Sequence, residues 1–153
     1  MRRAMIFCLL FFLVFPGSIS HASASDYSEI NVSEEDIELI IRLTHFETEG
    51  EPLLCKCAFA AVVFNRIKDG CFPANARDVV YSKGAFEATG RKDFTAALSE
   101  DKTTDDEIAV RYVFEKGIDP TCGALFVMKR GNVHLWEIQP TFQIGDFVFG
   151  NIP

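Results

Sequence analysis

The first half of the chain has the hydrophobic spacing of two consecutive helices. Apolar residues recur at every third or fourth position over residues 37–44, which is the period of one helix face. A Ser-Glu-Glu-Asp sequence at residues 33–36 resembles a capping box and predicts the start of this helix, and Gly50 predicts its end. A second helix is predicted over residues 52–68. Its segment 58–64 is apolar on all sides, which is typical of a central, buried helix.

The second half of the chain changes from helix to strand. Residues 75–81 predict a short helix and residues 82–94 an irregular loop that contains glycine. A second capping box, at residues 104–107, predicts a helix that ends at Gly117. Short apolar runs then predict strands at residues 124–128, 141–144 and 147–149. The pattern therefore favours an α+β domain that is mostly helical and carries a small C-terminal antiparallel sheet.

The start of the chain has the form of a secretory signal peptide. Arg2 and Arg3 precede an uncharged, mostly apolar run over residues 4–15, and Ala22-Ser23-Ala24 supplies the small residues of a cleavage site. The apolar run is too short to span a bilayer comfortably. We therefore expect residues 1–24 to be removed on export, which leaves a polar lead over residues 25–36 and one domain over residues 37–153.

The charge balance excludes two classes of partner. The formal net charge is −7, and loss of two arginines with the signal peptide makes it more negative. A nucleic-acid-binding protein would show a basic patch, and an acidic chain is not drawn to anionic membrane surfaces. We expect no nucleic acid partner and no membrane insertion after the signal is cleaved.

The cysteines favour a structural role over metal or nucleophile chemistry. The chain has five, and the four outside the signal peptide are Cys55, Cys57, Cys71 and Cys122. An even number in an exported protein permits two disulfides, whose connectivity stays open, except that Cys55 and Cys57 point roughly 200° apart on a helix and should not pair. A zinc site needs three protein ligands in close spacing, but only His45 and His134 are available beside these cysteines. We expect no metal and no cofactor.

Glu47 is the first candidate for chemistry. It lies in the last turn of the first predicted helix, on the same apolar face as Ile40 and Leu43. A carboxyl group there loses water and meets the negative end of the helix dipole, and both effects raise its pKa. A proton retained near neutral pH suits a general acid. The alternative is a partly exposed residue paired with a lysine or arginine.

Asn65 is the second candidate, near the end of the apolar helix. It follows Ala58 by seven residues and Val62 by three, so its amide should face the core. A buried amide needs hydrogen-bond partners. Asn65 could hold a loop or orient a carboxylate in a cleft; the alternative is a solvated helix end.

Six segments of this chain form a recognisable set in one collinear order. They are E-T-E-G-E-P at residues 47–52, V-V-F-N-R at 62–66, the F-P…V-V-Y stretch over 72–81, G-A-F-E at 84–87, D-P-T-C-G-A-L-F at 119–126 and I-G-D-F-V-F at 144–149. Together they resemble the SleB-type cell wall hydrolases, which include the catalytic domain of the spore cortex-lytic enzymes. The resemblance covers essentially the whole domain, from Leu39 to Phe149.

The resemblance implies a lysozyme-like fold and cleavage of the glycan strands of peptidoglycan, with Glu47 as the single catalytic glutamate. In the lytic transglycosylase reaction this acid protonates the oxygen between MurNAc and GlcNAc. Its carboxylate then takes the proton of the C6 hydroxyl of MurNAc, which gives a 1,6-anhydro product. A hydrolase would need a second carboxylate, for which Glu87 is the candidate.

The expected substrate-binding residues surround this glutamate. Tyr81, Phe86 and Trp136 are candidate apolar platforms for sugar faces, with core packing as the alternative for each. Asn65 and Glu87 complete the expected substrate-binding set.

Three positions depart from the family pattern, although Glu47 itself is kept. Glu49 replaces a family arginine, Phe147 a histidine and Val127 an aromatic residue. A degenerate module that binds peptidoglycan without cleaving it is therefore an alternative, and an amidase of the stem peptide is a weaker one. Export by this signal would lead to the periplasm or to the extracellular cell wall. The sequence shows no wall-binding repeat, so targeting depends on the domain itself or on an unknown partner.

Overall fold

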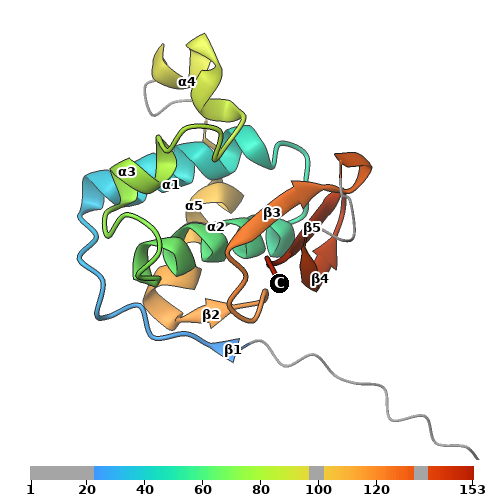
Figure 1. Cartoon of the computed structure of the whole chain (residues 1–153). Coiled ribbons are helices and arrows are strands. Elements are labelled where there is room, and N and C mark those ends of the chain that lie inside the picture. The colour runs from blue at the N-terminus through green and yellow to red at the C-terminus, as the bar shows by residue number, and fades with distance from the viewer. Residues whose placement is uncertain (1–22, 97–101, 133–137) are drawn as a thin grey trace, which may run out of the picture.

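The computed structural model describes residues 23–96, 102–132 and 138–153 of the chain (Figure 1). It is a mostly helical α+β domain with a small antiparallel sheet, which confirms the predicted fold class. The helices are α1 (Glu34–Glu47), α2 (Leu53–Lys68), α3 (Ala76–Val80), α4 (Lys92–Ala96) and α5 (Thr104–Lys116), with short 3₁₀ turns η1 (Ala88–Gly90) and η2 (Arg130–Asn132). The strands are β1 (Ser23–Ala24), β2 (Ile118–Asp119), β3 (Phe126–Lys129), β4 (Gln139–Ile144) and β5 (Phe147–Asn151).

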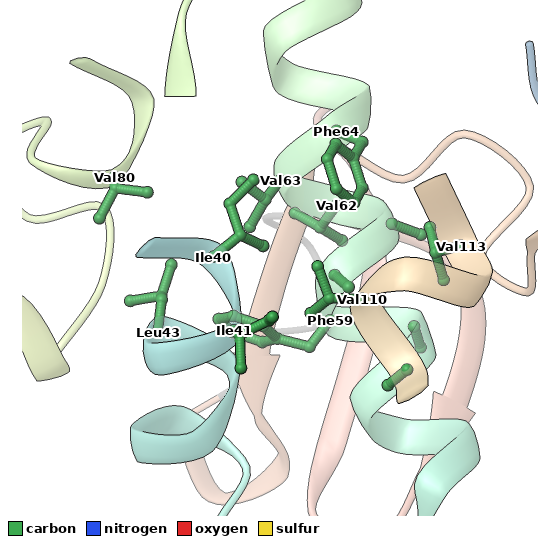
Figure 2. Close-up of a cluster of buried hydrophobic side chains, with 14 of the residues drawn as sticks. Ile40, Ile41, Leu43, Phe59, Val62, Val63, Phe64, Val80, Val110 and Val113 are labelled. Carbon is green, nitrogen blue, oxygen red and sulfur yellow. The ribbon is translucent and has the colours of Figure 1, made fainter. Parts of the chain in front are cut away.

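Helix α2 is the centre of the hydrophobic core, as its all-round apolar sequence predicts. Its residues from Cys55 to Ile67 are all buried. The apolar face of α1 and helix α5 both pack against α2, and Val80 of α3 adds to the same core (Figure 2). Each fully buried valine, leucine, isoleucine or phenylalanine side chain contributes roughly 1.5–3 kcal/mol to the free energy of unfolding relative to an exposed one. The core therefore fixes α1 and α5 relative to one central helix.

A three-stranded antiparallel sheet covers the side of the domain where α1 ends and α2 begins (Figure 1). Its order is β3-β5-β4, and the central strand β5 is buried over Phe147, Val148, Phe149 and Gly150. Gly150 is required by close approach, because a Cβ there would lie 2.1 Å from the carbonyl oxygen of Gln139 on β4. The sheet thereby brings the C-terminal segment against the end of α1.

The N-terminal lead is part of the core. Tyr27 is 1% exposed and its hydroxyl donates to the side-chain oxygen of Asn65 at 2.8 Å. Strand β1 consists of Ser23 and Ala24, the last two described residues of the predicted signal peptide, and it pairs with β2 of the domain. The remainder of that peptide, residues 1–22, lies outside the described residues, and its cleavage stays a prediction. None of the helices in the described ranges has both the length and the apolarity needed to cross a membrane.

Cys55 and Cys57 are buried thiols, and the described structure joins none of the cysteines in a disulfide. Burial, with the charge of Glu51 as the next cause, raises the pKa of Cys55 to about 12. Burial likewise raises the pKa of Cys57. Cys55 and Cys57 are therefore buried in the core as free thiols in this structure.

A buried ion pair joins three helices. The carboxylate of Asp106, on the first turn of α5, is 0% exposed and accepts from Lys56 Nζ on α2 at 2.6 Å and lies 2.9 Å from His45 Nδ1 on α1. Burial acts to raise the pKa of Asp106, but hydrogen bonds from Lys56, Thr103 and His45 outweigh it and lower that pKa. The carboxylate of Asp106 therefore stays charged, and its contacts link the three helices.

The capping box of α5 is shifted by one residue from the prediction. The cap is Thr103, whose side chain accepts from the backbone of Asp106, rather than Thr104 paired with Glu107. The physical reason is that Asp106 is held by Lys56 from another helix, so it is the residue drawn inward at the third helical position. The adjacent Glu107 instead bonds to Arg111 on the surface of the same helix.

Replacement of Lys56 by methionine tests this linkage. Lys56→Met leaves a buried carboxylate without its ammonium partner, and we expect it to lower the free energy of unfolding by about 3 kcal/mol. Urea denaturation measures the change. The exposed Lys116→Met is the matched control and should change stability by less than about 0.5 kcal/mol. Equal losses in the two variants would show that the pair does not hold the helices together.

Candidate active site

Glu47 is the last residue of α1, as predicted, and its carboxyl group faces a cavity of about 200 Å³. The backbone N–H of Ala88 donates to its Oε1 at 2.6 Å, so the loop that follows α3 fixes the orientation of the carboxyl. Besides Glu47, the cavity is lined by apolar side chains, by the loop that contains Gly84 and by two charged residues, Glu87 and Lys129. The full lining is Phe59, Gly84, Ala85, Phe86, Glu87, Val127, Met128, Lys129 and Phe147. The cavity thus lies between α1, α2, the 84–88 loop and the sheet.

The pKa of Glu47 is raised, mainly because burial removes water from the carboxylate. The backbone N–H of Ala88 acts in the opposite direction, the negative charge of Glu87 raises the pKa further, and Lys129 lowers it. Burial prevails, which agrees with the sequence argument that an apolar helix face surrounds this residue. The site therefore favours a carboxyl group that keeps its proton to a higher pH than usual, as a general acid requires.

The buried ion pair holds the segment that carries Glu47. Lys56 Nζ donates to the backbone carbonyl of Thr48 at 3.0 Å, one residue beyond Glu47, while it also binds Asp106. The Thr48 hydroxyl donates to the carbonyl of Thr44, which closes the last turn of α1. The ring of His45, in the last turn of α1, lies against Asp106. In the described ranges no three His, Cys, Asp or Glu residues are grouped so as to hold a metal ion.

Two further carboxylates lie near Glu47 in sequence or in space, and both are exposed. Glu87 is at the rim of the cavity, with its side chain 71% exposed and 3.2 Å from Lys129 Nζ. Glu49 faces solvent, and its charge acts on Arg91 rather than on Glu47. Glu87 is thus the second carboxylate that the structure brings to the cavity.

The predicted aromatic platforms separate into three cases. Phe86 lines the cavity, although it is only 7% exposed and packs against the ring of Phe59. Tyr81 is 40% exposed but lies outside the cavity lining, against Phe94 and under Arg77. Trp136 lies outside the described residues. The structure therefore brings Phe86 to Glu47 and places Tyr81 elsewhere.

Asn65 holds a loop, one of the two roles considered for it, and does not reach the cavity. Its amide nitrogen donates to Asp119 and to the carbonyl of Ala124, both at 3.1 Å, and its oxygen accepts from Tyr27. Asp119 in turn accepts from the backbone N–H groups of Thr121 and Gly123. Asn65 therefore connects α2 to the turn that leads into β3, and its polar atoms are used inside the protein.

Two of the three family departures line the cavity. Phe147 and Val127 both face the space beside Glu47, so an apolar residue stands where the family pattern has histidine and a smaller one where it has an aromatic. Lys129 and the N–H of Ala88 also act on Glu47, and the sequence analysis did not select them. No local pattern marks these two groups, since one is a backbone atom and the other lies 82 positions away along the chain.

The fold places the chain among known catalytic domains. It matches the crystal structure of the catalytic domain of the Bacillus cereus SleB protein with a TM-score of 0.70 and 28% identity, covering 79% of this chain and 93% of that one. It matches the catalytic domain of the germination-specific lytic transglycosylase SleB from Bacillus anthracis with a TM-score of 0.68 and 26% identity, covering 79% of this chain and 98% of that one.

Curated proteins and a family model give the same relationship. The spore cortex-lytic enzyme of Halalkalibacterium halodurans is 31% identical over 124 residues, which are 78% of this chain and 36% of that protein. The enzyme of Bacillus cereus is 30% identical over 122 residues, 76% of this chain and 44% of that protein. The model of the Cell Wall Hydrolase family matches residues 50–150, a range that begins just after Glu47. The chain belongs to the Cell Wall Hydrolase family, and it spans less than half the length of these two relatives.

Replacement of Glu47 by glutamine tests the protonation of the site through stability. A raised pKa means that the folded protein binds a proton more tightly than the unfolded chain, so ionisation of Glu47 lowers stability as the pH rises above about 4.5. Glu47→Gln removes this cost and keeps an oxygen to accept the Ala88 N–H. We expect a higher melting temperature than wild type at about pH 8, and no difference near pH 4, by circular dichroism. The exposed Glu49→Gln is the control; an equal gain from it would contradict the assignment.

Proposed function

We propose that this protein cleaves the glycan strands of peptidoglycan between MurNAc and GlcNAc, with Glu47 as acid and then base. The observation that carries the proposal is a partly buried carboxyl group of raised pKa in a cavity beside the sheet. The proposal is supported by the names of the similar proteins, which are spore cortex-lytic enzymes and a lytic transglycosylase. It concerns the domain seen here, because the matched segment covers only 36% and 44% of the two relatives.

The first step is proton transfer to the leaving oxygen. The protonated carboxyl of Glu47 donates its proton to the glycosidic oxygen, the bond from that oxygen to C1 of MurNAc breaks, and GlcNAc leaves as an alcohol. The carboxylate that remains is stabilised by the N–H of Ala88 and by the charge of Lys129. Burial thus favours the protonated form of Glu47, and the N–H of Ala88 and the charge of Lys129 stabilise the carboxylate once the proton has gone.

The second step closes the sugar on itself. The carboxylate of Glu47 takes the proton of the C6 hydroxyl of MurNAc while O6 forms a bond to C1, which gives a 1,6-anhydro product and returns Glu47 to its acid form. This step needs no water and no second carboxylate. Phe59, Phe86 and Phe147 support it, because these three side chains offer no polar group to position an attacking water; Glu87 and Lys129 are the charged side chains beside Glu47 in the cavity lining.

Hydrolysis is the second candidate reaction. The observation that favours it is a second carboxylate, Glu87, in the lining of the Glu47 cavity. An inverting glycosidase has two carboxyl groups separated by room for one water. Glu87 lines the same cavity, but it is paired with Lys129 and well exposed, so its environment favours a surface carboxylate rather than a tuned base. The predicted export of the chain would bring either activity to the periplasm or the extracellular cell wall.

Mass spectrometry of peptidoglycan fragments tests the reaction. Purified sacculi are incubated with the wild-type protein, Glu47→Gln and Glu87→Gln. We expect 1,6-anhydro muropeptides from the wild type and from Glu87→Gln, and at least about a 100-fold lower rate from Glu47→Gln, because it has no proton to donate.

Other products would change the assignment. Reducing-end fragments that disappear in Glu87→Gln would identify a hydrolase with Glu87 as its base. Binding to sacculi by the wild type without any fragments would identify the catalytically degenerate peptidoglycan-binding module instead. Circular dichroism of all three proteins shows whether the fold is kept.

The apolar residue Phe147 should set the pH range of the reaction. Phe147→His restores a polar, ionisable group to the cavity, which favours the carboxylate and lowers the pKa of Glu47. Because the acid form is the active one, the loss of rate on raising the pH should begin at a lower pH than in the wild type. The pH dependence of kcat/KM measures this shift. Gln143→His, exposed on the neighbouring strand β4, is the control and should leave the profile in place.

A further inference from the structure

A second, larger cavity adjoins the one that contains Glu47. Its volume is about 680 Å³, and four of its lining residues, Gly84, Ala85, Val127 and Met128, also line the Glu47 cavity. The shared wall, made by β3 and residues 84–85, makes the two cavities neighbours. A polymer that presents one of its bonds to Glu47 would therefore extend over this second space.

The second cavity is apolar and positively charged, in contrast to the chain as a whole. The chain has 22 acidic and 15 basic residues. Within the described residues, the lining of this cavity includes Arg66 and Lys83 and no aspartate or glutamate. Phe72, Phe126, Ile138 and Ile152 give it apolar walls. The lining thus complements a ligand that combines small apolar groups with negative charge.

Arg66 is a buried cation that has no carboxylate partner in the described part of the chain. It is 6% exposed, and its Nε donates to the carbonyl of Leu125 at 2.6 Å. Its guanidinium lies over the rings of Phe86, Phe72 and Phe126, at 4.9, 5.3 and 5.6 Å from their centroids. These rings and one carbonyl stabilise the charge only in part, because burial lowers the pKa of Arg66 to about 10. A bound anion would compensate it.

We infer that this second cavity, the stem-peptide groove, binds the carboxylate-bearing peptide attached to MurNAc, with Arg66 and Lys83 as the cations that receive its carboxylate. The inference rests on the proposed function, since it assumes a peptidoglycan strand at Glu47. A glycan backbone whose muramic acids all carry peptides has no free carboxylate. The peptide has free carboxylates and small apolar side chains, which match the charge and the walls of the groove.

The test compares glycan strands that keep their stem peptides with strands from which an amidase has removed them and on which the lactyl carboxylates left by the amidase have been converted to neutral amides. Each is offered to the wild type, and kcat and KM are measured; binding to Glu47→Gln is measured in parallel by calorimetry. We expect KM for the peptide-bearing strands to be about tenfold lower, the effect of one charge-assisted hydrogen bond. Lys83→Glu should abolish the preference for peptide-bearing strands, while Lys116→Glu, the same charge change away from the groove, should keep it.

Arg66 variants separate charge from structure. Arg66→Gln keeps a donor for the carbonyl of Leu125 but removes the charge, and Arg66→Lys keeps the charge. We expect the preference to fall in the first and to survive in the second. A purely structural role would lower activity on both substrates equally and leave their ratio unchanged. The exposed Lys83 carries the test if neither Arg66 variant folds.

The outcomes distinguish the two proposals. Equal KM and equal binding for the two kinds of strand would overturn the stem-peptide groove and leave the cleavage activity standing. Better turnover of the stripped strands would also overturn it. Absence of fragments from both substrates would overturn the proposed function, and calorimetry with Glu47→Gln would still decide the groove: preferential binding of peptide-bearing strands supports it, and equal binding does not.

Discussion

The structure depends on one buried charge, the carboxylate of Asp106. It is fully buried and accepts from Lys56 of α2 and from its own helix cap, with His45 of α1 beside it. A charge in this position is costly unless each partner is in place. Because Lys56 also binds the carbonyl of Thr48, the same interaction that joins three helices sets the end of α1. The position of Glu47 therefore follows from the way the core compensates a neighbouring charge.

The protein treats the carboxylates of Asp106 and Glu47 in opposite ways. Both lose water, but Asp106 receives an ammonium and several hydrogen bonds, whereas Glu47 receives the N–H of Ala88 and the distant charge of Lys129. The pKa of Asp106 is consequently lowered and that of Glu47 raised. Full compensation makes Asp106 a structural anion. Incomplete compensation leaves the pKa of Glu47 raised, which suits the acid role proposed for it, so the partners of each carboxylate decide the direction of its pKa shift.

Two of the three positions that differ from the family pattern, Val127 and Phe147, lie on the sheet. Val127 on β3 and Phe147 on β5 lie on neighbouring strands, where Val127 is opposite Phe149 and Phe147 is opposite Lys129, and both line the Glu47 cavity. The same strand β3 separates the Glu47 cavity from the stem-peptide groove through Val127 and Met128. Residues 127 and 147 therefore contribute to the polarity of the wall beside Glu47.

The sequence by itself determined the local features. Helical spacing, caps and glycine stops predicted α1, α2 and the strands, placed Glu47 at the end of α1, and turned Asn65 inward, because these features depend on neighbours within a few residues. Tertiary structure decided the rest. Lys56 and Asp106 are 50 positions apart, Tyr27 enters the core from a lead that looked polar, and Phe147 and Val127 reach the cavity through the pairing of strands. These contacts join distant segments, and only the packing of the whole domain brings such segments together.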